Sequence, residues 1–365
     1  MAINDQVADG SGPSQSMPPR IVHLEGGLRA VDFRAESVVV QISAKLPLLK
    51  FQTPEYSHLY QALASLGFLP IGVEFPHPLT LEGKLAPDWQ CFFPDLGFRL
   101  MEERKEWSNI RHLALKEGES TVSQISSKCV TYIDLLEIRL FELSTAYNRS
   151  LQAHWMDETK IGQLFGNSYM RGIDAAIHGF AADAGSFRDL LAELTWRFVL
   201  NEAEEVTTLG TFIKRAKNNQ HPLAIEIVEA ASPNGWLKRF SRLRDNIIHV
   251  APVGRSQQFH FCQTREVGST AHKAPCLHYP ILTSDGRIWD DSDVAPTMND
   301  EELIKAGFEK YLSYLDTSID GLSYASQTLK EMTGLLGKVR AASGLKGEMP
   351  HLTDADIIGE IKNAE

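Results

Sequence analysis

The sequence predicts a mainly α-helical protein, in which a helical bundle follows a small α/β region and precedes a β-hairpin region and a long C-terminal helix. Three observations support this fold class. Residues 121–155 contain neither Pro nor Gly, which is typical of one long helix. Apolar residues recur at helical spacing after residue 186 and again after residue 236. Short β-branched and aromatic runs occur on either side of this helical part.

Composition excludes several classes of protein. The 365 residues are 43% hydrophobic and 23% charged, which is typical of a globular chain and excludes full disorder. The net charge of −11 excludes a generally basic nucleic-acid-binding surface, although it allows a locally basic site. No apolar run reaches the ~20 residues that span a bilayer, and the N-terminus lacks a signal pattern. The four cysteines are expected to be free thiols, so we predict a cytoplasmic protein with no membrane partner.

The N-terminal part divides into a tail and a small α/β region. Residues 1–20 are polar and rich in Gly, Pro and Ser, so we expect a disordered tail. Within residues 21–115, the runs at 38–42 and 68–75 predict strands. The sequence between these runs predicts a helix that Gly67 ends.

Residues 116–252 are expected to form the bundle. After the long first helix, Ser186 is predicted to cap a second helix, with Asp189 completing a capping box. A short helix is expected next, opened by Thr208-Leu209-Gly210. Ser232 and Pro233 then predict the start of a further helix. That helix carries an apolar stripe and is expected to end at Val250-Ala251-Pro252; the stripe comprises Trp236, Phe240, Leu243 and Ile247.

The C-terminal part is predicted to contain a hairpin and a helix. Residues 253–298 form the β-hairpin region, with a turn at Ser284-Asp285-Gly286. Residues 299–345 are expected to form one long helix packing on the bundle, and residues 346–365 a flexible tail.

The candidate catalytic residues lie at the end of the apolar-striped helix. Arg244, Asp245 and His249 follow a basic face, for which we predict RNA binding by Lys238, Arg239 and Arg242. Between residues 211 and 244 there are seven Lys or Arg and only two Glu, which makes this part locally positive. An Arg supplies a fixed charge for a phosphate, and a His can move a proton near neutral pH. Together they suit metal-free RNA cleavage, in which the 2′-hydroxyl attacks its own phosphate.

The spacing by itself has little specificity, because Arg149–His154 and Arg255–His260 share it. Only the pair at 244 and 249 combines a helix end, an acid directly after the Arg and a basic lead-in. On an α-helix, five residues turn ~500°, which leaves the two side chains ~140° apart. They converge on one phosphate only if the helix end is distorted or the cleft wraps around it.

This combination resembles the HEPN family of helical ribonuclease and toxin domains. Their signature is an Arg, then commonly a polar residue, and a His near the end of a bundle helix, as in Arg244-Asp245-Asn246-Ile247-Ile248-His249. The segment SFRDLLAELTWRFVL and the turn at Thr208-Leu209-Gly210 also resemble family features. The resemblance covers about residues 119–250.

The resemblance implies a HEPN-like bundle and a metal-independent endoribonuclease that needs no cofactor. Arg244 and His249 would be the catalytic pair, positioned by Asp245, and a homodimer would line one cleft with two such pairs. Phage defence or a toxin system, with a regulatory or antitoxin protein, is the implied setting. Some members carry a modified Tyr two residues after the His, where this chain has Ala251. The alternative is a non-catalytic HEPN-like module for RNA or protein binding and dimerisation, in which Arg244 and His249 are helix-end charges.

A zinc site is a second chemical possibility. His260 and Cys262 are two residues apart, as are Cys276 and His278, so each pair shares a strand face. If the strands pair, these four side chains could surround zinc, with His272 nearby. Because the spacing matches no standard zinc motif, ordinary packing is the preferred interpretation and no metal is predicted.

Overall fold

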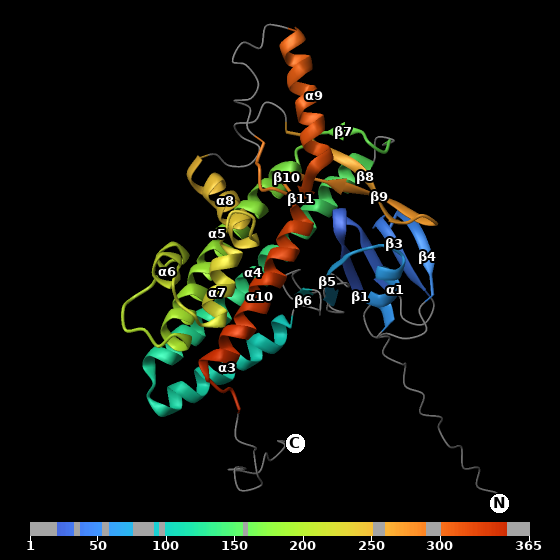
Figure 1. The fold of residues 1–365 in the computed structure, drawn as a ribbon. Helices are drawn as coiled ribbons and strands as arrows, with labels where there is room; N and C mark the ends of the chain where they lie inside the picture. The colour runs from blue at the N-terminus through green and yellow to red at the C-terminus, as the bar shows by residue number, and fades with distance from the viewer. Residues whose placement is uncertain are drawn as a thin grey trace, which may run out of the picture.

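A computed structural model describes residues 20–32, 37–52, 58–75, 91–94, 99–155, 160–250, 260–289 and 301–348. Long helices lie side by side in one half of the molecule, and an N-terminal sheet lies beside them (Figure 1). The protein is mainly α-helical, as the sequence predicts. Every helix among the described residues is too short or too polar to cross a membrane.

The N-terminal part forms a six-stranded antiparallel sheet in the order β4-β3-β2-β1-β5-β6. Helix α1 (Leu59–Ser65) lies between β4 and β5 and is followed by Gly67 with φ of 83°, which confirms the predicted helix stop. The strands predicted at 38–42 and 68–75 are β3 and β5. The strands are β1 (Arg20–Leu24), β2 (Arg29–Asp32), β3 (Val38–Ser43), β4 (Leu46–Phe51), β5 (Pro70–Phe75) and β6 (Cys91–Pro94).

The helical part begins earlier than residue 116. Helix α3 (Leu100–Glu117) packs along α4 (Ser120–Trp155), which is the single long helix that the sequence predicts. Leu100, Trp107 and Ile110 are buried on one face of α3. The predicted 21–115 boundary is therefore wrong, because this amphipathic helix belongs to the bundle.

Helix α5 (Met170–Leu194) starts sixteen residues before the predicted cap at Ser186. Ser186 lies inside α5, and its hydroxyl donates to the Ala182 carbonyl oxygen (3.2 Å). The prediction failed because Ser186 and Asp189 match a capping box although they lie in a helix interior, where Gly179 and Gly185 are also tolerated. Each glycine accommodates an arginine: a Cβ at either glycine would lie 3.1 Å from the Nε of Arg139 or Arg244.

Two shorter helices follow a π-helical segment at residues 195–199. Helix α6 (Leu209–Ala216) opens at Thr208-Leu209-Gly210 as predicted, and the Thr208 hydroxyl caps it by accepting from the Thr211 N–H (3.2 Å). Helix α7 (Pro222–Ala230) comes next.

Helix α8 (Trp236–Asp245) starts after Gly235, so the predicted start at Ser232 and Pro233 is wrong. A Cβ at Gly235 would lie 2.0 Å from the Ala230 oxygen, so the tight turn that enters α8 requires glycine.

The region predicted as a β-hairpin does contain one, but the hairpin predicted around Ser284–Gly286 is wrong. Strands β8 (Cys262–Ser269) and β9 (His272–His278) pair around residues 270–271, and β7 (Leu164–Phe165) pairs with β8. The chain does turn at Ser284–Gly286, but β10 (Pro280–Thr283) pairs with β11 (Ser318–Asp320) instead of a following strand.

The predicted C-terminal helix is two helices, α9 (Glu301–Thr317) and α10 (Gly321–Ser343). They are separated because β11 joins β10, and Asp320 then caps α10 by accepting from the Ser323 N–H (3.0 Å). Helix α10 packs on α3, α4 and α5, whereas α9 projects from the top of the view in Figure 1. Residues 1–19 of the predicted tail at 1–20, residues 349–365 of the predicted tail at 346–365, and the helix end at Ala251 and Pro252 lie outside the described residues. Arg20 belongs to β1.

Candidate functional site

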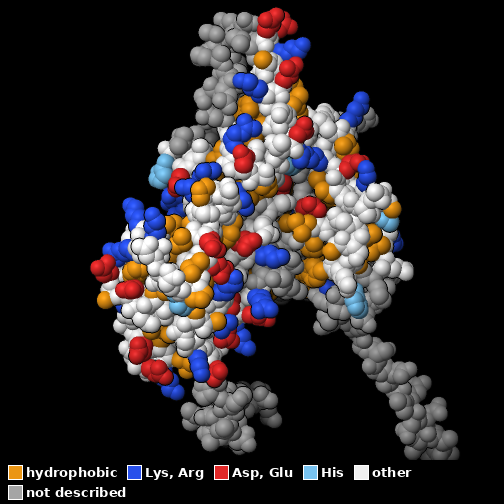
Figure 2. Space-filling view, viewed as in Figure 1, with side chains coloured by type: hydrophobic (Ala, Val, Ile, Leu, Met, Phe, Trp, Pro, Cys, Tyr) orange, Lys and Arg blue, Asp and Glu red, His pale blue; other side chains and the backbone are white. Residues whose placement is uncertain are grey.

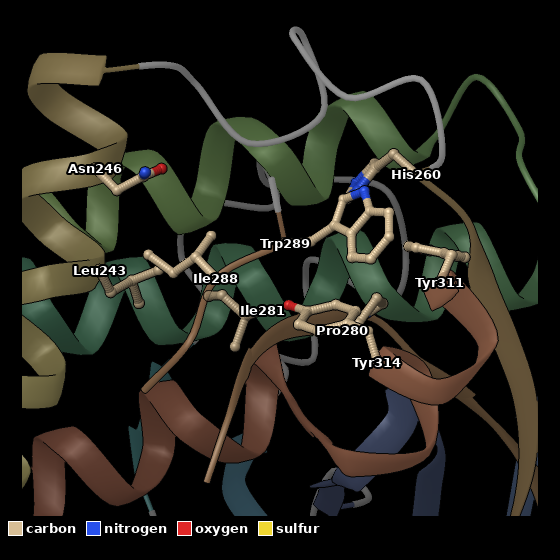
Figure 3. A pocket seen from close by; sticks show the side chains of 9 residues that line it. All are labelled: Leu243, Asn246, His260, Pro280, Ile281, Ile288, Trp289, Tyr311 and Tyr314. Atoms are coloured by element: carbon tan, nitrogen blue, oxygen red, sulfur yellow. The ribbon is translucent and has the colours of Figure 1, made fainter. Parts of the chain in front are cut away.

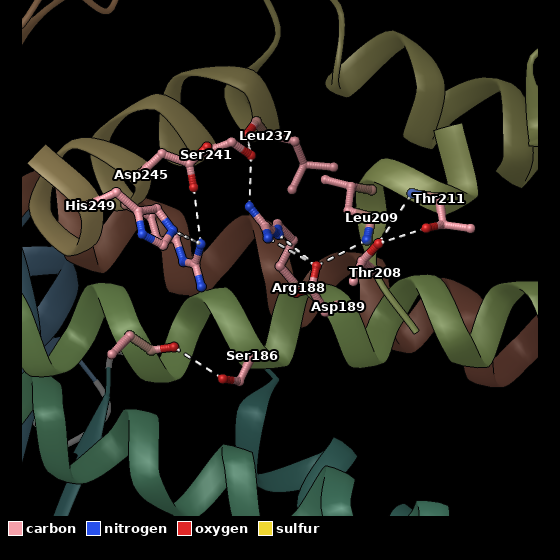
Figure 4. Close-up of polar contacts among 12 residues, drawn as sticks. Ser186, Arg188, Asp189, Thr208, Leu209, Thr211, Leu237, Ser241, Asp245 and His249 are labelled. Carbon is pink, nitrogen blue, oxygen red and sulfur yellow. Dashed lines mark hydrogen bonds and ion pairs between the residues drawn. The ribbon is translucent and has the colours of Figure 1, made fainter. Parts of the chain in front are cut away.

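The end of α8 is distorted in the way that the predicted pair requires. Residues Asn246–Val250 form a π-helix that continues α8. A π-helix bonds residues five apart, so its wider turn brings a residue over the one five positions before it. Nη1 of Arg244 consequently lies 3.4 Å from Nε2 of His249 (Figure 4). The structure therefore brings the two predicted catalytic side chains together.

The contact is compatible with one tautomer of the imidazole. A guanidinium can only donate hydrogen bonds, so Nε2 of His249 is its acceptor in the tautomer that carries the ring proton on Nδ1. His249 is exposed, so its imidazole is open to solvent while it faces the arginine. This neutral form is the one that can take a proton from a hydroxyl group.

Arg244 is held by its neighbour and by α5. Its Nη1 also donates to Oδ1 of Asp245 (3.0 Å), and its side chain is 27% exposed. The side chain packs against Gly185, where a Cβ would lie 3.1 Å from Nε. Nη2 makes no hydrogen bond to any residue that the structure describes, so this half of the guanidinium can donate to an anion.

A second arginine, which the sequence analysis missed, joins α5 to α8. Nη1 of Arg188 donates to the Ser241 hydroxyl (2.9 Å), and its Nε and Nη2 both reach Oδ1 of Asp189 (3.1 and 2.9 Å; Figure 4). The same Asp189 oxygen accepts from the Leu209 N–H at the start of α6 (3.0 Å). Asp189 therefore accepts a hydrogen bond at the start of α6, and the capping-box role predicted for it in α5 is wrong. The recurrence of apolar residues at helical spacing after Gly185 was the only sign in the sequence that Arg188 lies on a bundle helix.

The predicted RNA-binding residues lie on another side of α8. Arg242 and Arg244 are about 200° apart around the helix. Arg239 and Arg242 approach the turn after β10, where a Cβ at Gly286 would lie 3.2 Å from Cγ of Arg239 and 3.7 Å from Nη1 of Arg242. Lys238 is exposed. The structure does not bring these three side chains onto the Arg244–His249 pair.

The four zinc candidates do not converge. Nε2 of His260 contacts the Tyr279 hydroxyl (2.7 Å), and Nε2 of His278 contacts the Ser318 hydroxyl (2.8 Å). Cys262 pairs with β7, whereas Cys276 pairs with Arg265 in the hairpin. Over the described ranges, no three His, Cys, Asp or Glu side chains are grouped to hold a metal.

A serine–histidine–glutamate cluster lies between the sheet and α4. Nδ1 of His23 lies 3.0 Å from the Ser144 hydroxyl, and Nε2 lies 2.9 Å from a Glu74 oxygen. His23 and Ser144 are fully buried, and burial together with the charge of Arg29 holds the pKa of His23 well below its ordinary value. Because no substrate can reach the serine, this cluster joins the sheet to the bundle.

A small aromatic pocket lies beside the π-helix. It is lined by Asn246 and His260 together with Trp289, Tyr311 and Tyr314 (Figure 3). Its volume of about 10 Å³ is that of one water molecule, so it cannot hold a nucleobase. The three aromatic side chains pack on one another instead and anchor α9.

Comparison of the chain with models of known protein families, with curated proteins and with solved structures finds no match. The residues of the site therefore carry the functional argument by themselves.

Proposed function

We propose that the protein is a metal-independent endoribonuclease of the HEPN type, with Arg244 and His249 as its catalytic pair. The observation that carries this proposal is the π-helical end of α8, which sets Nη1 of Arg244 3.4 Å from Nε2 of His249. π-helical turns are rare and frequently occur at functional sites. The pair is also accessible, because His249 is exposed and Arg244 is partly exposed.

The proposed reaction is an internal transesterification. Nη1 of Arg244 leaves Nε2 of His249 when the RNA binds, and the 2′-hydroxyl then loses its proton to Nε2 as the 2′-oxygen bonds to phosphorus. The bond from phosphorus to the 5′-oxygen breaks, and that oxygen takes up a proton from water. The products are a 2′,3′-cyclic phosphate and a 5′-hydroxyl end. The guanidinium of Arg244 binds the charge of the pentavalent phosphate, and Asp245 fixes the orientation of that guanidinium.

The other parts of the proposal follow from the family resemblance. A homodimer would place two Arg–His pairs in one cleft, and a regulatory protein would restrain the activity in a defence or toxin system. Lys238, Arg239 and Arg242 would hold RNA phosphates away from the scissile one, because they lie on another side of α8.

The test is cleavage of RNA by the purified protein in EDTA, with analysis of the product ends. Arg244→Ala and His249→Ala should each abolish cleavage, whereas Arg171→Ala, at an exposed site in α5, and His272→Ala, at an exposed site in β9, should retain it. Cleavage by the wild type that leaves other ends, or equal cleavage by all five proteins, would contradict the assignment. Salt-sensitive RNA binding without cleavage would favour the non-catalytic binding module.

A further inference from the structure

A cavity of about 590 Å³ lies between the start of α3 and the middle of α10. Cavities of roughly 300–1,000 Å³ are typical of small-molecule sites. None of its lining residues belongs to α8 or to the π-helix, so it is separate from the Arg244–His249 pair. The lining residues are Arg99, Glu103, Lys330, Glu331, Thr333, Gly334, Gly337, Lys338, Arg340 and Ala341.

Small residues line part of the α10 wall of this cavity, beside the side chains of Lys330 and Lys338. Gly334, Gly337 and Ala341 are spaced by three and four residues, so they share one face of the helix. A Cβ at Gly334 would meet no atom within 4 Å, which shows open space in front of the backbone, whereas a Cβ at Gly337 would lie 3.0 Å from a Glu103 oxygen. Glycine inside a helix is destabilising relative to alanine, and Gly334 packs against nothing. The open space at Gly334 lets a ligand approach the helix closely.

Two cations in this cavity are not paired with an acid. Within the described part of the chain, Arg99 and Lys330 form no ion pair, whereas Lys338 pairs with Glu226 (2.5 Å). Arg99 also has a left-handed backbone, with φ of 53°, which residues other than glycine seldom adopt. Two unpaired cations beside one cavity suit a ligand with negative charges.

The acidic residues of the cavity do not cancel this charge. Glu103 is nearly buried and accepts two hydrogen bonds from Arg340, from Nε and from Nη2 (2.9 Å each), so the pair is neutral. Glu331 accepts from the Gln327 amide (2.7 Å) and is the remaining carboxylate. Figure 2 shows Lys, Arg, Asp and Glu side chains gathered along the front of the molecule, where α10 runs in Figure 1.

We propose that this cavity binds a small phosphate-bearing molecule of nucleotide size. Arg99 and Lys330 hold its phosphate groups, and the open space at Gly334 receives its body. The carboxylate of Glu331 accepts a hydrogen bond from an amino group of the ligand. The site works independently of RNA cleavage, so neither proposal depends on the other.

The test is titration calorimetry of the full chain with ATP and, in parallel, with inorganic tripolyphosphate, both in magnesium-free buffer. Arg99→Ala and Lys330→Ala should each weaken ATP binding at least about fivefold, because each removes a charge-assisted contact. Gly334→Leu should abolish binding, because its side chain fills open space in the cavity. Leucine is also a better helix former than glycine, so the melting temperature should not fall.

Two controls match these variants. Gly210→Leu adds the same side chain on α6, where a Cβ also meets nothing within 4 Å, and Lys305→Ala removes an exposed lysine from α9. Both should bind ATP as the wild type does. Tighter binding of ATP than of tripolyphosphate would identify a nucleotide, and equal binding would identify an inorganic polyphosphate; either supports the site.

Three results would overturn the proposal. The first is the absence of binding for both probes at millimolar concentration. The second is undiminished ATP binding by Gly334→Leu. The third is a wild type that binds an RNA oligonucleotide but not ATP, with RNA binding lost in Gly334→Leu, which would make the cavity part of an RNA path.

Discussion

Nη1 of Arg244 lies 3.4 Å from Nε2 of His249, although an α-helix would turn the two side chains ~140° apart. The π-helix at Asn246–Val250 closes this angle, and Gly185 of α5 leaves room for the arginine beside it. The orientation of the pair therefore depends on a residue outside it, which gives a way to test the proposed site without removing Arg244 or His249.

Gly185→Ala should lower RNA cleavage about ten- to a hundredfold while the protein remains folded. The added Cβ would lie 3.1 Å from Nε of Arg244 and 3.3 Å from Cγ, so the arginine must move. Displacements near 1 Å can reduce rates about a hundredfold. Alanine is more favourable than glycine inside a helix by about 0.5–1 kcal/mol, so thermal unfolding should occur at an equal or higher temperature.

The matched control is Gly172→Ala in the same helix. A Cβ there would make an ordinary contact, 3.7 Å from Cβ of Ala146, so cleavage should not change. Equal rates for the wild type and for Gly185→Ala would show that the position of Arg244 does not limit the reaction.

Asp189→Ala should destabilise the protein by about 2–3 kcal/mol, because it leaves a buried guanidinium without its acid. The variant also removes the acceptor for the Leu209 N–H at the start of α6. Ser241→Ala, which loses one neutral partner of Arg188, should cost about 1 kcal/mol. Urea unfolding measures both values.

Asp183→Ala on the same helix is the control for these variants. Asp183 pairs with Arg139, but both side chains are partly exposed (22% and 34%), so the loss should stay below about 1 kcal/mol. If Asp189→Ala is no more destabilising than Asp183→Ala, the network between α5, α6 and α8 contributes little to stability.

Sequence periodicity was sufficient for α4, and side-chain chemistry for the start of α6. The 36-residue helix α4 has no helix breaker, and Thr208 marks the start of α6 by its side-chain chemistry. The start of α5 was predicted wrongly, because Ser186 and Asp189 resemble a helix cap although they lie inside the helix. Gly185 lies within α5, where it leaves space for Arg244, 59 positions later in the chain. Local sequence cannot reveal such a long-range contact.

The sequence likewise predicted only part of the candidate site. The residue types at 244, 245 and 249 identified the pair, but no local pattern marks the π-helix that joins Arg244 to His249 where α8 packs on α5. Arg188 was missed because nothing in its neighbourhood indicates that Ser241 lies within hydrogen-bond distance. The break between α9 and α10 was missed because β11 forms only by pairing with β10.

His278 should make the protein sensitive to acid. Burial, assisted by the charge of Arg265, lowers the pKa of His278 from 6.5 to about 3. His278 therefore binds a proton in the unfolded chain at a pH where it stays neutral in the folded chain. Its contribution to the free energy of unfolding is fully present above pH 6.5 and falls as the pH drops towards 3. Between pH 7.5 and 4.5 the loss should be about 2–3 kcal/mol.

His278→Gln should remove this part of the pH dependence, since an amide can still donate to the Ser318 hydroxyl. His272→Gln, at an exposed position in the same strand, should keep it. Urea midpoints at pH 7.5 and 4.5 provide the comparison, and an unchanged slope in His278→Gln would assign the acid sensitivity to other groups.

Glu137 should make the protein less stable as the pH rises, which is opposite to the effect of His278. Burial raises the pKa of this α4 carboxyl from 4.5 to about 7, against the opposing charge of Arg104, and its Oε2 makes no hydrogen bond to any residue that the structure describes. The folded chain therefore holds the proton more tightly than the unfolded chain, so stability falls as the pH rises from 4.5 to 7. Glu137→Gln should be more stable than the wild type at pH 8 by about 1–2 kcal/mol, allowing for solvent screening, and equal to it near pH 4. Glu142→Gln, exposed on the same helix, should show no such gain, and a Glu137→Gln curve parallel to the wild type from pH 4 to 8 would mean that this carboxylate is solvated in the folded protein.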